Sequence, residues 1–141
     1  RTAPFPAHLI FDAPSRQICT ATRPRTNTPL QALVMMNDPL FVGAAGALAQ
    51  KTLQCGAASE SDKARFLFRS VLSRSPAAFE IDLLLATFEQ QQKIYEADPK
   101  LAADLIQFAG LTDPQHPQPN LAAWTNVASI VLNLDEAITR E

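Results

Sequence analysis

Apolar residues recur at helical spacing over most of the chain after residue 28. The clearest stripe stands at i, i+3, i+4, i+7 and i+8, which is one face of an amphipathic helix. It consists of Ala64, Leu67, Phe68, Val71 and Leu72. No segment reads as a strand, so the pattern predicts an all-α fold. We expect an irregular bundle of about five or six helices with an extended N-terminal arm.

Prolines mark several of the predicted helix starts. Thr28-Pro29-Leu30-Gln31 is typical of a capping box, in which Thr28 is the N-cap, Pro29 takes the first helical position and Gln31 reaches back to the cap amide. Asp38-Pro39 repeats the signal, and the sequence leaves open whether Pro39 separates two helices or kinks one. Further starts are predicted at Ser75-Pro76, Asp98-Pro99 and Asn120.

Helical spacing also predicts which side chains face the core. The expected inward positions are Leu30, Leu33 and Val34; Phe41, Ala44, Ala45, Leu48 and Ala49; Ile81, Leu84, Leu85, Phe88 and Tyr95; Leu101, Leu105 and Phe108; and Trp124, Val127, Ala128, Val131, Leu134 and Ile138. Gly43, Gly46 and Ala47 are small enough to let another helix approach closely, and we expect Gly110 to end a helix.

The first 28 residues show no sustained helical period. Four prolines there oppose regular structure, while apolar residues such as Phe5 and Phe11 could anchor an extended arm. An arm of this length without elements is unusual in a complete domain. We therefore expect a segment of a longer protein, with residues 1–28 forming a basic arm and residues 29–141 a helical domain.

Composition narrows the class of protein. The 141 residues suit one core, and 47% hydrophobic with 18% charged residues is ordinary for a globular domain. A net charge of −2 argues against nucleic-acid binding through phosphate contacts. The longest apolar run, residues 40–49, is too short for a membrane span. Residues 1–36 hold four arginines against Asp12 alone, so we expect this arm to lie on an acidic body, another domain or a ligand.

Cysteine and histidine provide little chemistry. Cys19 and Cys55 are too few for a disulfide scaffold, and their spacing leaves a single bridge open. His8 and His116 stand far apart in Pro-containing stretches, so neither a metal site nor His-based catalysis is expected. Residues 19–23 resemble the sulfatase formylglycine signature, but the acidic metal cluster and the α/β fold of that family are missing from the pattern.

The first candidate site precedes the helix at Pro29. Arg23 and Arg25, with Thr26, Asn27 and Thr28, could hold a carboxylate, sulfate or phosphate beside the helix N-terminus. In the alternative, which we favour, Thr28 caps the helix, Asn27 braces the turn and the arginines pair with acids of the body.

The second candidate site is a polar stripe on the last predicted helix. Its members are Asn126, Ser129, Asn133, Glu136 and Arg140. A solvent-exposed helix face explains most of this polar stripe. However, Asn133 and Asp135 interrupt an otherwise apolar run, which indicates a specific hydrogen-bonding role. We expect this helix to pair with Arg23 or Arg25, in a structural rather than a catalytic contact.

Three stretches together carry a family resemblance. They are Phe11-Asp12-Ala13-Pro14-Ser15-Arg16 with Cys19-Thr20; Arg23 to Pro29 with Gln31-Ala32-Leu33 and Asn37-Asp38-Pro39; and Ala123-Trp124 with Leu132-Asn133-Leu134-Asp135-Glu136 and Thr139-Arg140-Glu141. The chain resembles a planctomycete-specific domain of unknown function found at the C-terminal end of large cytochrome-c-associated proteins. The family's activity is not established, so no catalytic residue is carried over.

The resemblance implies an exported parent protein with a cytochrome-c-like domain near its N-terminus. Haem would then lie elsewhere in the parent, and we expect no cofactor or metal in this chain. The function we expect is a non-catalytic helical module that packs against the other domains of that parent. The alternatives are a polar, anion-binding or polysaccharide-binding surface that completes an active site of the parent, and a homo-oligomerisation module.

Overall fold

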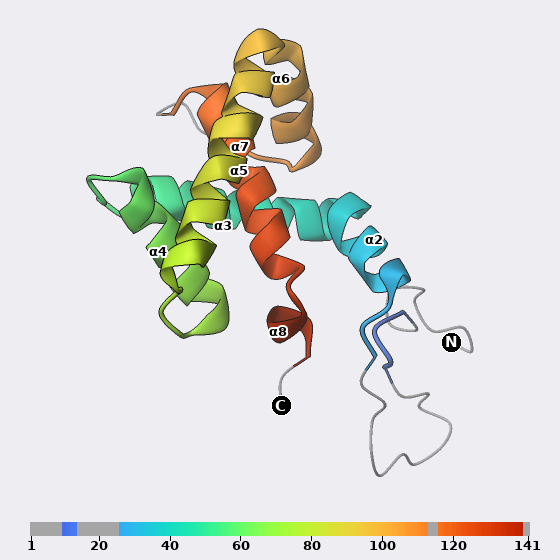
Figure 1. Cartoon of the computed structure of the whole chain (residues 1–141). Helices are drawn as coiled ribbons and strands as arrows, with labels where there is room; N and C mark the ends of the chain where they lie inside the picture. The colour runs from blue at the N-terminus through green and yellow to red at the C-terminus, as the bar shows by residue number, and fades with distance from the viewer. Residues whose placement is uncertain (1–9, 14–25, 113–115, 140–141) are drawn as a thin grey trace.

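The computed structural model describes residues 10–13, 26–112 and 116–139. Seven helices and no strand lie in these residues, so the all-α prediction is confirmed (Figure 1). They are α2 (Pro29–Asn37), α3 (Pro39–Gln54), α4 (Glu60–Leu72), α5 (Ala78–Ala97), α6 (Pro99–Phe108), α7 (Gln118–Leu132) and α8 (Asp135–Ile138). The helix beyond the expected five or six is α8, because the last predicted helix is broken in two.

Helix α7 forms the centre of the core. Figure 1 shows α3 crossing behind α5 and α7, with α6 alongside the upper part of α5. Eight of the 15 residues of α7 are buried, and Trp124 is fully enclosed. Its ring lies 4.8 Å from that of Phe88 on α5. Asn126 adds a polar brace to the same pair of helices, because its amide donates to Gln91 Oε1 at 2.7 Å and to the Tyr95 hydroxyl at 2.8 Å.

Three of the predicted helix starts are confirmed. Thr28 and Gln31 form the capping box of α2, with Pro29 at the first position. Asp38 accepts from the Leu40 amide at the start of α3, and Asp98 does the same for α6. Pro39 separates two helices, which meet at 66°. Within the described residues no single helix has the length and apolarity of a membrane span; only α2 and α3, taken as one bent pair, meet that criterion.

Two predicted starts are wrong. Helix α5 begins at Ala78, two residues beyond Pro76, because the Glu80 carboxylate accepts from the Ala77 amide at 2.6 Å and sets the first turn there. Helix α7 begins at Gln118, so Asn120 lies inside it rather than at its cap. Proline is tolerated in the first turn because its missing N–H has no partner there, and Pro119 therefore does not delay the helix.

The inward faces of α4 and α5 are as predicted, whereas those of α2, α3 and α6 are partly wrong. On α2 the predicted Leu30 and Leu33 are exposed and Gln31 is buried. On α3 Ala44 is exposed. The buried positions of α3 are Val42, Ala45, Gly46, Ala49, Thr52 and Leu53. On α6 the buried residues are Ala102, Ile106 and, at its cap, Ala109, whereas Leu101 and Phe108 are half-exposed. Ala102 and Ala109 are therefore inward positions that the apolar spacing of leucine and phenylalanine did not reveal.

The end of α6 explains why a glycine stands at position 46 of α3. Gly110 takes a positive φ of 66° as predicted, and the Leu111 amide bonds to Ile106 O at 3.0 Å while the Gly110 amide bonds to Gln107 O at 3.0 Å. These bonds are a Schellman motif. They place Leu111 directly over Gly46, where any side chain would overlap with it. Gly46 therefore admits the loop after α6 rather than the helix that we expected.

The last predicted helix does not continue through residue 138. Helix α7 ends at Leu132, Leu134 is extended, and α8 is a separate turn with no buried residue. The expected inward face is therefore wrong beyond Val131, since Leu134 is exposed and Ile138 is half-buried. The break occurs at Asn133, whose backbone N–H closes the final turn of α7 on Ser129 O and Ile130 O.

Candidate functional site

A buried glutamine connects the N-terminal segment to α2. Gln31 is 1% exposed. Its amide Nε2 donates to the Ile10 carbonyl at 2.8 Å and to Thr26 Oγ1 at 3.1 Å, and its Oε1 accepts from the Thr28 amide at 2.8 Å. The capping box thus has a second role, because the glutamine that caps α2 also holds the backbone carbonyl of Ile10 and the side-chain hydroxyl of Thr26.

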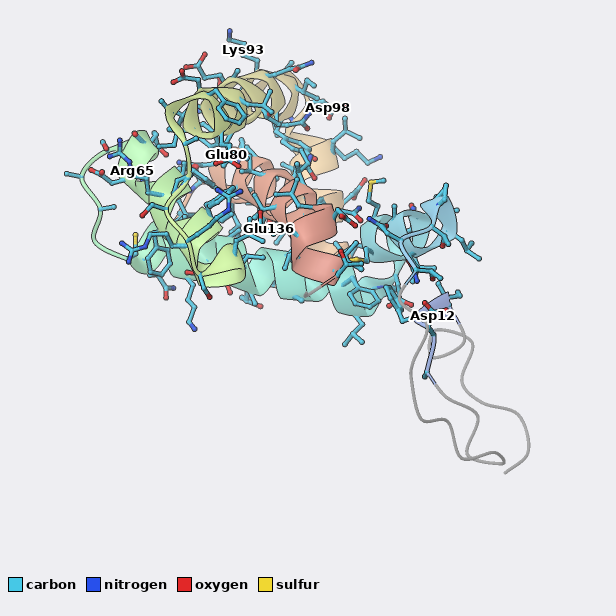
Figure 2. All side chains as sticks on the ribbon, turned by 60° about the horizontal axis from the view of Figure 1, so that its bottom comes forward. Asp12, Arg65, Glu80, Lys93, Asp98 and Glu136 are labelled. Atoms are coloured by element: carbon cyan, nitrogen blue, oxygen red, sulfur yellow. The ribbon has the colours of Figure 1, made fainter. Side chains whose placement is uncertain are left out.

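The hydrogen bonds continue outward from Gln31 to a carboxylate. Thr26 donates to Asp12 Oδ2 from both its amide, at 3.0 Å, and its hydroxyl. The hydroxyl therefore accepts from Gln31 and donates to Asp12. Figure 2 shows Asp12 on the segment beside α2. These contacts lead from a buried amide to a half-buried carboxylate.

The turn before α2 also contacts the C-terminal segment. Asn27 Nδ2 donates to Asp135 Oδ1 at 2.6 Å, across 108 residues of sequence. Asn133 Nδ2 donates to the Ala32 carbonyl at 3.3 Å. We call the set Asp12, Thr26, Asn27, Thr28, Gln31 and Asp135 the polar junction. In it the predicted residues Thr26, Asn27, Thr28 and Asp135 come together, with Asn133 next to them.

The structure does not describe the predicted arginines. Arg23 and Arg25 lie outside the described residues, as does Arg140. The predicted pairing of the last helix with Arg23 or Arg25 therefore lies outside the described residues, and within them it is Asn27 that joins the turn before α2 to Asp135. The polar stripe of the last helix does not form one face, because the helix breaks at Asn133 and Asn126 faces α5 instead.

Glu136 belongs to a separate cluster around Arg74. Arg74 Nε lies 2.8 Å from Glu136 Oε1, and its Nη2 lies 2.7 Å from Glu80 Oε1. The guanidinium also stacks 4.7 Å from the centre of the Phe68 ring. The cluster joins α4, α5 and α8, and Figure 2 labels its two carboxylates. Arg74 was not among the predicted site residues, because it lies in a turn where no periodicity marks a partner.

The Arg74 cluster shifts the acidity of its members. The hydrogen bond from Arg74, and next the one from the Ala77 amide, lower the pKa of Glu80 to about 2. The hydrogen bond from Arg74 also lowers the pKa of Glu136. The pKa of Arg74 itself is raised by its bonds to the two carboxylates, that to Glu80 first. All three side chains are at the surface, so salt screens the cluster.

This cluster predicts a dependence of stability on acidity. A carboxylate whose pKa is lower in the folded chain stabilises it above the unfolded pKa, and that contribution disappears as the pH falls toward the folded pKa. Stability contributed by Glu80 should therefore be complete above pH 4.5 and decline toward pH 2. The midpoint temperature of thermal unfolding, measured across this pH range, should fall less steeply with decreasing pH in Arg74→Met than in the wild type. Parallel curves for the two proteins would contradict the assignment.

The cysteines and histidines form no site within the described residues. Cys55 is a free, half-buried thiol, and Cys19 and His8 lie outside the described residues, as does the whole of residues 19–23. Over residues 10–13, 26–112 and 116–139, no three side chains of His, Cys, Asp or Glu are grouped to hold a metal ion. What the described residues do bring together is hydrogen-bonding capacity at the polar junction and an ion-pair cluster at Arg74.

Comparison with known families identifies one match. The model of the family described as PSD1, protein of unknown function (DUF1553), matches residues 1–88. This range contains the arm, α2, α3, α4 and the first half of α5. Comparisons with curated proteins and with solved structures found no match.

Proposed function

Since the chain belongs to the PSD1 family of proteins of unknown function (DUF1553), we propose that it is a non-catalytic helical module of a larger protein and packs against that protein's other domains. The resemblance of its motifs extends the proposal. The parent is an exported, cytochrome-c-associated planctomycete protein, and this module stands toward its C-terminal end. Any haem is carried by another domain of the parent.

The observation that carries the proposal is an apolar face that no described residue covers. Leu30, Leu33 and Met36 on α2, with Leu40 at the start of α3, have side chains that are 52% to 74% exposed. Leu30, Leu33 and Met36 stand three residues apart and so lie along one side of α2, and Leu40 follows in the first turn of α3. An isolated exposed leucine needs no explanation, but several large apolar side chains exposed along one short helix are typical of an interaction surface.

The polar groups support the same proposal. In the polar junction, the Thr28 hydroxyl accepts from the backbone N–H of Gln31, and the side-chain amide of Asn27 donates to Asp135. Groups that an anion or a sugar would need at the start of α2 are therefore used within the chain. The alternative, a surface that binds an anion or a polysaccharide for the parent's active site, would have to draw on Arg23 and Arg25 instead.

A double variant with Leu30→Glu and Leu33→Glu should show whether this face serves binding to another domain or the folding of this chain. In this chain alone the double variant should change the free energy of unfolding by less than about 1 kcal/mol, because both side chains are already in water. In the intact parent, amide hydrogen exchange should show α2 protected in the wild type and exposed in the variant.

Leu83→Glu provides the matched control, because Leu83 is an equally exposed leucine on α5. It should leave the protection of α2 unchanged in the parent. If the α2 amides of the unsubstituted parent exchange as fast as those of this chain alone, no domain covers the face and the proposal is wrong.

A further inference from the structure

Helix α8 is attached to two separate parts of the fold by adjacent side chains. It is four residues long, and none of its residues is buried. Glu136 Oε1 lies 2.8 Å from Nε of Arg74, in the turn between α4 and α5. Asp135 Oδ1 accepts from the Asn27 side chain at 2.6 Å, before the start of α2. Because adjacent helical positions point in different directions, this single turn connects the Arg74 cluster to the polar junction.

The Arg74 end of this connection is fixed without α8. Arg74 donates to the Glu80 carboxylate from Nη1 at 2.9 Å and from Nη2 at 2.7 Å. Its guanidinium also stacks on Phe68, which is buried in the core. Glu136 binds through Nε and Nη2. A guanidinium that pairs with two carboxylates in this way contributes more than an isolated surface ion pair. Arg74 is therefore the fixed partner, and α8 is the part that can leave.

Helix α2 is held to the later helices by few polar contacts. It projects beyond the end of α3, on the side away from α4 (Figure 1), and meets α3 at 66°. Its buried residue Gln31 bonds to groups that precede α2 in the chain. Within the described residues, residues 10–37 make two polar contacts with helices after α3, Asn27 with Asp135 and Ala32 with Asn133. The contact with Asp135 is shorter and has a charged acceptor, so it is the stronger one.

We propose that α8 is a clasp that holds α2 at its angle to α3, and that the ion pair of Glu136 with Arg74 keeps this clasp closed. A single helical turn is not stable by itself. Without the ion pair α8 therefore leaves its place, and the Asp135 carboxylate leaves Asn27 with it. Helix α2 then changes its angle to α3 and carries its exposed leucines along. As regulation of the surface through which the module binds the parent's other domains, this inference rests on the proposed function.

The clasp is tested in the complete chain by nuclear magnetic resonance, with Glu136→Gln as the variant that removes the charge and keeps the size of the side chain. Amide exchange at Ile138 and Thr139, whose N–H groups bond to carbonyls of residues 134 and 135, should accelerate about tenfold. Residual dipolar couplings of α2 should shrink about twofold relative to those of α5, because motion of α2 averages them. Raising the ionic strength should loosen the wild type in the same way and should have little effect on the variant, since salt screens the ion pair.

Two further variants separate the ends of the clasp. Asn27→Ala removes the contact with Asp135 and leaves that of Glu136 with Arg74. The couplings of α2 should therefore shrink as in Glu136→Gln, while exchange in α8 changes by less than about twofold. Adding Arg74→Met to Glu136→Gln should accelerate exchange in α8 no further, because the pair is already broken.

Arg65→Met is the matched control. It breaks an ion pair of similar exposure, that of Arg65 with Asp62 at 3.0 Å, which lies within α4. It should change neither the exchange of α8 nor the couplings of α2. Circular dichroism of each variant confirms that it is folded.

Three results would overturn the proposal. Unchanged exchange in α8 of Glu136→Gln would mean that the ion pair does not keep the clasp closed. Faster exchange in α8 with unchanged couplings of α2 would mean that α8 does not position α2. Equal effects in Arg65→Met would mean that the loss of any surface ion pair loosens the chain. All are measured in this chain alone, so they are distinct from a failure of the proposed function, which is tested in the intact parent.

Discussion

Replacing Trp124 by alanine is expected to lower the free energy of unfolding by about 3–5 kcal/mol, the range measured for large-to-small changes of enclosed aromatic residues. Trp124 is 0% exposed, lies at the centre of α7 and packs on Phe88. The loss is a large share of the stability of about 5–15 kcal/mol that is typical of such domains. Urea unfolding followed by circular dichroism measures this loss. Fluorescence is unsuitable, because Trp124 is the one tryptophan of the chain and the alanine variant removes the signal.

Phenylalanine at the same position should cost much less. The indole Nε1 of Trp124 is buried without a hydrogen-bond partner in the described part of the chain, and an unsatisfied buried donor itself costs about 1–3 kcal/mol. Trp124→Phe removes that donor while keeping most of the ring, so we expect a loss below about 2 kcal/mol. Phe79→Ala, at an exposed position of α5, should have no measurable effect. If Trp124→Phe and Trp124→Ala lowered the free energy of unfolding equally, the indole N–H would form a stabilising hydrogen bond, and the expectation would be wrong.

The second large effect is expected at Gln31. Methionine has a similar length but cannot hydrogen-bond as the amide does. Gln31→Met leaves the Ile10 carbonyl and the Thr28 amide without their partner. We expect a loss of about 2–3 kcal/mol, from the cost of leaving polar groups unsatisfied in a buried place. Amide exchange should also increase at Thr26 and Thr28, since their contacts depend on Gln31.

Gln107→Met is the matched control for this experiment. Gln107 is an exposed glutamine on α6, so the same substitution there should change stability by no more than about 0.5 kcal/mol. If Gln31→Met were equally mild, the polar junction would be held by Asp12 and Asp135 alone, and the central role of the buried amide would be wrong.

Local signals were sufficient for many of the helix boundaries. The starts of α2, α3 and α6 follow from a capping residue before a proline, and the end of α6 follows from Gly110, because such caps satisfy backbone groups within a few residues. The starts of α5 and α7 were misplaced where other contacts decide. Glu80 sets the first turn of α5, and Pro119 is accommodated inside α7.

The candidate site was predictable only in part. Thr26, Asn27 and Thr28 were expected from their position before the start of α2, and Asn133 and Asp135 from their place in an apolar run, and the structure brings these five residues close together. Their pairing spans more than 100 residues, so no spacing rule could reveal it. Arg23 and Arg25 lie outside the described residues, and Glu136 belongs to the Arg74 cluster. Arg74, Glu80 and Glu136 come from a turn and two helices, and only Glu136 had been singled out.

The sequence by itself determined the helical class, the starts of α2, α3 and α6, and which faces of α4 and α5 are buried, because these depend on contacts within one or two turns. The tertiary structure alone decided that Gln31 is buried while Leu30 and Leu33 are exposed, and that the last helix breaks at Asn133. Which face of a short helix is buried depends on what packs against it. On α2 the N-terminal segment supplies hydrogen bonds to a buried amide, and no described element covers the leucines.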